Sequence, residues 1–162
     1  MIIRKARDVD DNAIWSVLEP VLRDGATYTL PRDMSRSDAL AYWRRPDHQT
    51  FVAEDNGKII GTYYLRTNQA GPGDHVCNCG YVVSAAASGK GVARLMNAHS
   101  QNIAKKSGYR AMQYNAVVAT NVRAVTLWQR CGFDIIGTLP GAFYHPRDGY
   151  VDALIMYKTL IE

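Results

Sequence analysis

Residues 76–94 read VCNCGYVVSAAASGKGVAR and contain the pattern that decides the fold. The Val- and Tyr-rich first part of this stretch predicts a strand over residues 75–84. Small residues follow, and Gly89-Lys90-Gly91 then leads into a predicted helix over about 92–106. The expected apolar face of this helix consists of Val92, Leu95, Met96 and Ile103.

The glycine turn is a candidate anion site. A strand that enters a helix through glycines leaves the first N–H groups of the helix unpaired at the positive end of its dipole, where phosphate binds. Gly89-Lys90-Gly91 lacks the spacing and the magnesium-binding hydroxyl of an ATPase loop, so ATP hydrolysis is not predicted. A tight turn without any ligand would use the same glycines, so the turn needs a second motif beside it.

Both flanks of this stretch contain regular elements. The N-terminal flank predicts a strand, two helices and two strands, over residues 1–6, 8–25, 38–45, 50–54 and 58–67. Asp55-Asn56-Gly57 between the last two is a strong hairpin signal, so these strands are expected to be antiparallel. The C-terminal flank predicts a strand, a helix capped by Thr120 or Asn121, and two strands, over residues 112–118, 121–130, 133–139 and 151–160. The order β-α-α-β-β-β-α-β-α-β-β indicates one mixed α/β domain over residues 1–162.

The composition favours a globular domain with a small ligand. The chain has 162 residues, of which 47% are hydrophobic, and a net charge of +4. This charge is too small and too dispersed for a nucleic-acid surface but is compatible with a polyanionic small ligand. The first residues alternate apolar and charged side chains, and no apolar run approaches the length of a membrane span. Neither a secretion signal nor a membrane anchor is therefore predicted.

The cysteines indicate a reducing compartment. Cys77, Cys79 and Cys131 are an odd number in a chain that is large enough to fold without a disulfide, which favours the cytoplasm. Cys77 and Cys79 should face one side of a strand, and they lack a second Cys/His pair at ligand spacing. No metal site is expected.

A second motif completes the pattern. Residues 121–133 read NVRAVTLWQRCGF, beginning after one strand and ending before another. Together with SGKGVA at residues 88–93, this motif resembles the GNAT superfamily of acyl-CoA-dependent N-acyltransferases. The resemblance spans nearly the whole chain and implies the GNAT fold, a central, mostly antiparallel sheet of about seven strands flanked by about four helices. It also implies acetyl-CoA as co-substrate, and the family leads us to expect a homodimer.

The resemblance implies a role for each matching position. Backbone N–H groups of the glycine turn would hold the pyrophosphate of coenzyme A, and Gly91→Asp should abolish that binding because its carboxylate would meet the pyrophosphate and its Cβ would crowd the turn. The preceding strand would pair with the pantetheine arm, and N–H groups around Val82 would stabilise the oxyanion during catalysis. The implied cofactor-binding residues are Tyr81, Val82, Val83, Gly89, Lys90, Gly91, Val92, Ala93, Arg94, Asn121 and Trp128.

Three departures from the family pattern concern side chains. Ser88 stands where Gln or Arg is usual, which removes one side-chain contact to the pyrophosphate. Trp128 occupies the place of the Tyr that commonly reprotonates the thiolate, and indole does not deliver a proton as a phenol does. The usual Glu positions fall on Asn78 and Ala116, so no carboxylate base is visible. An ordered water is the first candidate base, followed by His75, Asp74 or Tyr144, and the amine can also arrive already neutral.

The acceptor site is expected around Asn78 and Asn115, on two strands that diverge near the thioester in this family. Their amides would position the acceptor, or they would merely satisfy backbone groups at a strand irregularity. The stretch HVCNCGY at residues 75–81, with Asn115 six residues before Asn121, also resembles the microbial branch that N-acetylates proline analogues such as azetidine-2-carboxylate.

Two further stretches bear on the acceptor. The tail over residues 143–156 is similar to the ribosomal-protein N-terminal acetyltransferases, in which a Tyr in this loop, here Tyr144, flanks the acceptor channel. Such enzymes normally keep the Glu and Tyr that this chain lacks. The segment over residues 23–45 lines the acceptor side in this fold and suits a carboxylated or partly apolar acceptor, through Arg32, Arg36 and Arg44 beside Tyr28, Tyr42 and Trp43.

The sequence therefore predicts an acetyl-CoA-dependent N-acetyltransferase that acts on a small amine or amino acid by direct attack on the thioester. The expected acceptor-binding residues are Asn78, Asn115 and Tyr144. Two alternatives stay open, an acetyltransferase of peptide or protein N-termini and a non-catalytic acyl-CoA-binding module.

Overall fold

A computed structural model describes residues 1–161 and contains, within them, a seven-stranded sheet and four α-helices. The strands are β1 (Ile2–Lys5), β2 (Gln49–Asp55), β3 (Lys58–Thr67), β4 (Val76–Val83), β5 (Ala111–Val118), β6 (Asp134–His145) and β7 (Gly149–Thr159). The helices are α1 (Asp11–Asp24), α2 (Arg36–Trp43), α3 (Val92–Lys106) and α4 (Val122–Arg130). This arrangement confirms the predicted mixed α/β fold. The last residue of the predicted domain, Glu162, lies outside the residues that the structure describes.

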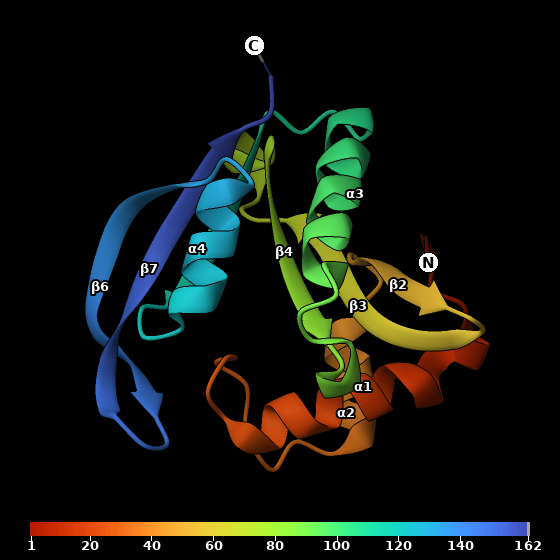
Figure 1. Cartoon of the computed structure of the whole chain (residues 1–162). Coiled ribbons are helices and arrows are strands. Elements are labelled where there is room, and N and C mark those ends of the chain that lie inside the picture. The colour runs from red at the N-terminus through yellow and green to blue at the C-terminus, as the bar shows by residue number, and fades with distance from the viewer. Residues whose placement is uncertain (162) are drawn as a thin grey trace.

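The sheet has the order β1-β2-β3-β4-β5-β7-β6, and β4–β5 is its one parallel pair (Figure 1). The parallel pair requires a crossover, which α3 provides. In Figure 1, β4 stands between α3 and α4, and β6 and β7 form the far edge. No helix within residues 1–161 combines the length and the apolar composition that a bilayer span requires.

Both faces of the sheet are covered, and β3 shows why. Tyr63 and Leu65 belong to a core with α3, whereas Tyr64 belongs to a second core with α1 and α2. Successive side chains of a strand point to opposite faces, so this alternation places α3 on one side of the sheet and α1 and α2 on the other. The burial of Val92 and Met96 confirms that α3 packs through the predicted stripe, but Leu95 lies beside that stripe and is 49% exposed.

The predicted hairpin is confirmed. Asn56 and Gly57, between β2 and β3, have φ values of 49° and 75°. Two successive positive φ values form the tight turn that matches the twist of antiparallel strands.

The second half of the sheet differs from the sequence prediction. Residues 140–150 were expected to form a loop, yet β6 continues to His145 and β7 begins at Gly149. Pro140 lies within β6, at the edge of the sheet, where a missing N–H leaves no ladder bond broken. The register shifts between Leu139 and Phe143, so a bulge carries the strand past the irregular residues.

A buried carboxylate fastens β1 to the start of α1. Asp10 is 5% exposed, and its oxygens accept hydrogen bonds from the Arg4 guanidinium at 2.7 and 3.0 Å and from the Arg7 backbone N–H at 2.7 Å. The hydrogen bonds from Arg4 lower the pKa of Asp10 well below its ordinary value. Arg4 also pairs with Glu54 on β2.

We expect Asp10→Asn to lower the free energy of unfolding by about 2 kcal/mol at neutral pH. This is less than the cost of breaking a fully buried ion pair, because Arg4 keeps its pairing with Glu54. The folded-state pKa of Asp10 lies below its unfolded value of about 3.9, so the stabilisation is complete above that pH and is lost as the pH falls further. Urea titrations from pH 7 to pH 3 should show the difference between wild type and variant shrinking. Asp8→Asn, at a fully exposed carboxylate, is the control and should change little; a pH-independent difference for Asp10→Asn would contradict the assignment.

Candidate functional site

The site begins where β4 and β5 separate. The two strands pair at Val76–Ala111 and Cys77–Met112, and then diverge. Asn78 bridges the start of the gap, because its Nδ2 donates to the Gln113 carbonyl at 2.9 Å. Beyond this bridge, β4 pairs with no strand on its β5 side within the described residues.

A cavity of about 1060 Å³ fills this gap. Its walls come from β3, β4, β5, α4, the turn before α3 and residues 27–30 between α1 and α2. No Asp, Glu or His lines the cavity among residues 1–161. Its charged lining side chains are all basic, namely Arg66, Arg94, Arg123 and Arg130. The electrostatic environment therefore favours an anionic ligand.

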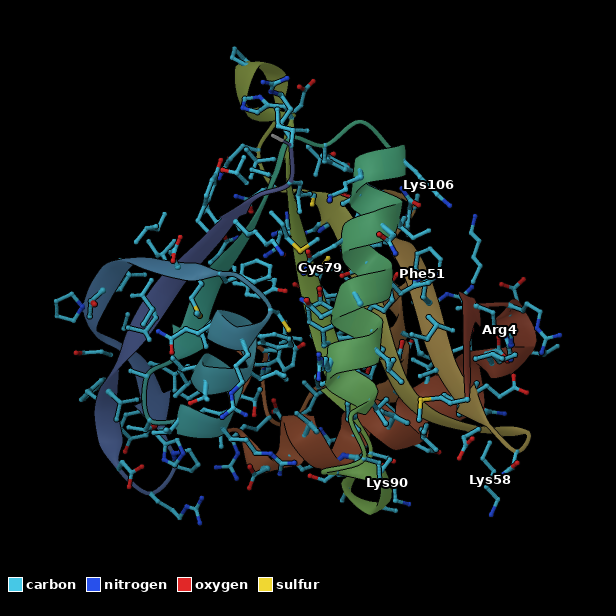
Figure 2. The ribbon with its side chains drawn as sticks, turned by 45° about the horizontal axis from the view of Figure 1, so that its top comes forward. Arg4, Phe51, Lys58, Cys79, Lys90 and Lys106 are labelled. Carbon is cyan, nitrogen blue, oxygen red and sulfur yellow. The ribbon has the colours of Figure 1, made fainter. Side chains whose placement is uncertain are left out.

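The glycine turn lies at one end of the cavity, at the N-terminus of α3; Figure 2 shows Lys90 at this end of the helix and Lys106 at the other. Gly89 and Gly91 have φ values of 83° and 77°, which explains why glycine stands at both positions. The backbone N–H groups of Gly89 and of residues 91–94 have no backbone acceptor among the described residues. The Lys90 N–H differs from the prediction, because it already donates to the Ala87 carbonyl at 3.3 Å.

Helix α4 closes the cavity on the other side. Asn121 caps it, its Oδ1 accepting from the Ala124 N–H at 3.2 Å, which selects Asn121 over Thr120 as the cap. Trp128 packs against the rings of Tyr81 and Tyr114, with centroids 5.1 and 5.2 Å away. Asn121 and Trp128 both line the cavity, and their contacts with the cofactor stay a prediction from the resemblance.

An arginine from α4 reaches the glycine turn. Arg123 Nη1 donates to the Ser88 hydroxyl at 2.9 Å, and both residues line the cavity. A guanidinium thus lies beside the position where the family usually has Gln or Arg. This replacement could not be predicted from the local pattern, because the two residues are 35 positions apart.

The register between β3 and β4 decides which β4 amides face the cavity. The Ser84 N–H donates to the Ile60 carbonyl, so even-numbered residues at this end of β4 direct their backbone groups toward β3. The N–H of Val82 is therefore committed to β3, and its side chain is buried beneath α1 and α2. The amides of Tyr81 and Val83 face the gap instead. The expectation that the Val82 N–H faces the thioester is therefore wrong, and the N–H groups of its two neighbours face the gap.

The carbonyl of Tyr81 fits the same alternation. It accepts a hydrogen bond from the Tyr28 hydroxyl at 2.8 Å, across the cavity side of β4. The side chain of Tyr81 points the other way, toward α3, where its hydroxyl lies 2.7 Å from Ser100 Oγ and 3.1 Å from the Tyr114 hydroxyl. Burial raises the pKa of Tyr81 and Tyr114 well above the ordinary value, so both phenols stay neutral.

Asn78 and Asn115 both line the cavity, but they have different surroundings. Asn78 is buried, and its Oδ1 has no hydrogen-bond partner among residues 1–161, although its Nδ2 is used. The Asn115 amide is held on both sides, because its Oδ1 accepts from Gln113 at 3.0 Å and its Nδ2 donates to Asn68 at 2.8 Å. The backbone irregularity that the sequence suggested is present, since the β5–β7 register shifts between Tyr114 and Val117.

Several other candidates lie away from the cavity. Tyr144 is 68% exposed and meets the ring of Tyr150 edge-on, because the strand alternation turns Phe143 and His145 inward. Asp74 and His75 precede β4 at the end where it still pairs with β5, and neither lines the cavity. These three residues are therefore not placed as bases.

The arginines expected on the acceptor side are engaged elsewhere. Arg32 donates to the Arg23 carbonyl, Arg36 to Asn12, and Arg44 to Asp11. Arg66 on β3 lines the cavity in their place, and the sequence analysis did not single it out.

The two strand cysteines face the core. Cys77 and Cys79 are buried beside α3, as their spacing predicted, and burial raises the pKa of the Cys77 thiol to about 12. Figure 2 shows Cys79 beside the middle of this helix. No group of three or more potential metal ligands occurs within residues 1–161.

Comparisons with known proteins agree with this architecture. A family model described as the acetyltransferase (GNAT) family matches residues 15–133, more than half of the chain. The chain belongs to the GNAT acetyltransferase family. It is 30% identical over 149 residues to the N-acetyltransferase aca1 of Schizosaccharomyces pombe, and the alignment covers 81% of this chain and 71% of that relative.

Solved GNAT structures superpose on nearly the whole chain. A GCN5-related N-acetyltransferase from Kribbella flavida is 38% identical, with a TM-score of 0.93, covering 98% of this chain and 96% of that one. The yncA protein of Salmonella typhimurium was solved with its cofactor acetyl-CoA; it shares the fold at 22% identity and a TM-score of 0.87, covering 100% and 95%. The GNAT fold and N-acetyltransferase activity predicted from the two motifs are thus confirmed.

Proposed function

We propose that this GNAT protein transfers an acetyl group from acetyl-CoA directly to the amine of a small molecule or amino acid. The observation that carries the proposal is the cavity between β4 and β5, which joins a built anion site at one end to a polar and aromatic chamber at the other. The proposal includes one domain over residues 1–162, which acts in the cytoplasm as a homodimer.

The residues at the anion end fit coenzyme A. Free N–H groups of Gly89 and residues 91–94 would hold the pyrophosphate, with Arg94 and Arg123 supplying positive charge. The Val83 amide would pair with the pantetheine arm as a neighbouring strand would, which leaves the Tyr81 amide, closer along β4 to Asn78, for the thioester. The Asn121 amide nitrogen, oriented by the cap bond of its oxygen, would reach the same arm, and Trp128 would form a wall.

The reaction needs an oxyanion site, an exit for one proton and a source for another. The amine lone pair attacks the thioester carbon, a C–N bond forms, and the C–S bond breaks. The Tyr81 amide would donate to the carbonyl oxygen as it gains charge. Asn78 and Asn115 would position the acceptor nitrogen, with the free Oδ1 of Asn78 accepting its N–H.

The protein supplies no charged base in this proposal. The cavity lining lacks Asp, Glu and His among the described residues, so water takes the proton of the amine, or the amine binds already neutral. The phenols of Tyr81 and Tyr114 keep their protons, and water returns a proton to the thiolate.

Thiol release tests the proposal. Purified protein would be incubated with acetyl-CoA and a panel of amino acids, proline analogues, polyamines and N-terminal peptides, and free thiol would be followed against a reaction without acceptor. Calorimetric titration of acetyl-CoA would run alongside. Release with small amines or amino acids supports the proposal; release with peptides alone points to N-terminal acetylation. Binding without any release identifies a binding module and contradicts the proposed reaction.

Arg123 provides a further prediction. Arg123→Met is expected to raise the Kd for acetyl-CoA about tenfold, because it removes an exposed cation beside the pyrophosphate site. The effect should shrink in high salt. Calorimetry on Arg147→Met, an exposed arginine on the β6–β7 turn, is the control for the loss of one positive charge. An unchanged Kd for Arg123→Met would remove this residue from the site.

A further inference from the structure

The acceptor end of the cavity contains a guanidinium without a counter-ion. Arg66 lies on β3 and is half-buried, and it lines the cavity. Its one side-chain hydrogen bond within residues 1–161 is long, 3.3 Å from Nη1 to the Thr67 carbonyl, and it makes no ion pair with a described carboxylate. By contrast, Arg44 binds Asp8 and Asp11, and Arg4 binds Asp10 and Glu54.

The register places this guanidinium beside the reacting end of β4. Arg66 and Asn78 are directly opposite each other in the antiparallel pair, so their side chains share a face. Tyr64, two residues along β3, lies on the same face, and Tyr42 approaches it with its hydroxyl 3.3 Å from that of Tyr64. Arg66 is thus the charged group of a chamber with phenolic walls.

We propose that Arg66 binds the carboxylate of the acceptor, which makes the acceptor an amino acid whose amine lies beside Asn78 and the open edge of β4. The inference rests on the proposed function and specifies its substrate class. A guanidinium offers paired N–H donors that match the two oxygens of a carboxylate, so it fixes both the position and the rotation of the acceptor.

The chemistry of the chamber excludes the other acceptor classes on the panel. A polyamine would place a second cation in a cavity whose charged side chains are all basic among residues 1–161. A peptide N-terminus has an amide where a free amino acid has its carboxylate, so it offers Arg66 no carboxylate at that position. The pyrophosphate of coenzyme A would lie at the opposite end of the cavity and would not neutralise Arg66. The positive field also reaches His48, whose pKa is lowered by burial first and also by the charges of Arg66 and Arg45.

Matched acceptors provide the test. Wild-type protein would be assayed for thiol release with amino acids, including azetidine-2-carboxylate, each beside its own carboxamide. We expect the best acid to exceed its carboxamide in kcat/KM by about thirtyfold, the size of a charge-assisted pair. Arg66→Met should remove that preference, mainly by raising the KM of the acid, and Arg66→Lys should restore part of it. The KM for acetyl-CoA and the melting temperature should stay as in the wild type.

Arg45→Met is the matched control, because Arg45 is an exposed neighbour paired with Asp47 and does not line the cavity. It should preserve the preference for the acid. If Arg66→Met lowers the rates with acid and carboxamide equally, the carboxylate site is overturned. Acetylation of carboxylate-free amines as efficiently as of any acid also overturns it and leaves the proposed function standing. Absence of transfer to every acceptor, with acetyl-CoA still bound, overturns both.

Discussion

Gly91→Asp is expected to raise the Kd for acetyl-CoA about a hundredfold. The new carboxylate would lie at the N-terminal end of α3, where the free N–H groups of residues 91–94 await the pyrophosphate. Two like charges a few ångströms apart near a protein surface repel by a few kcal/mol, and 2.8 kcal/mol corresponds to about a hundredfold in affinity. Isothermal titration calorimetry with acetyl-CoA measures the change directly.

Gly91→Asn separates charge from backbone strain. Gly91 has a φ of 77°, a conformation that Asn and Asp tolerate better than most residues, and no atom lies within 4 Å of a Cβ built there. The expectation that a Cβ would crowd the turn is therefore wrong, and only charge distinguishes the two variants. We expect Gly91→Asn to bind acetyl-CoA within a few-fold of wild type. Equal affinities for the Asp and Asn variants would mean that the pyrophosphate is bound elsewhere.

Gly80→Ala is expected to lower the free energy of unfolding by about 3 kcal/mol and the melting temperature by about 6–12 °C. A Cβ at residue 80 would lie 2.6 Å from Cε1 of Tyr64. That ring has no room to retreat, because it stacks on His48 with centroids 4.4 Å apart and meets the edge of Trp43 at 4.8 Å. Thermal unfolding followed by circular dichroism provides the measurement.

Two companion variants isolate the clash. Gly137→Ala adds a methyl group to another strand at an ordinary 3.7 Å from Ile155, so it should change stability by less than about 0.5 kcal/mol. In a Tyr64→Ala background, Gly80→Ala should cost little, because the atoms it strikes are gone. A full loss of stability in that background would show that Tyr64 is not the obstacle.

The sequence predicted the elements that local patterns encode. Asn56-Gly57 specified its hairpin, Asn121 capped its helix, and the glycine turn preceded its helix, because each depends on a few neighbouring residues. The same holds for the anion end of the site, where the positive φ of Gly91 and the free N–H groups follow from one short stretch.

The remainder of the site depends on strand pairing, which the sequence does not encode locally. Whether Val82 or its neighbours face the cavity depends on the register between β3 and β4, and a shift of one residue reverses the answer. Arg66 was missed for the same reason, since its place opposite Asn78 is a property of the pair of strands. Arg44 is expected on the acceptor side because residues 23–45 line that side in the resembled fold, whereas its ion pairs with Asp8 and Asp11 join residues that are distant in the sequence.

In the proposed reaction, a cavity lining without acidic and imidazole side chains among residues 1–161 would shift the selection of substrates to the basicity of the amine itself. The α-amine at a peptide N-terminus, with a pKa near 8, is neutral in about one molecule in ten at pH 7, whereas a lysine side-chain amine with a pKa near 10.4 is neutral in about one in 2,500. Where no side chain removes the proton, only the neutral fraction reacts. Two amines of equal shape would then be sorted by their proton affinities, a form of specificity that no contact in the chamber has to provide.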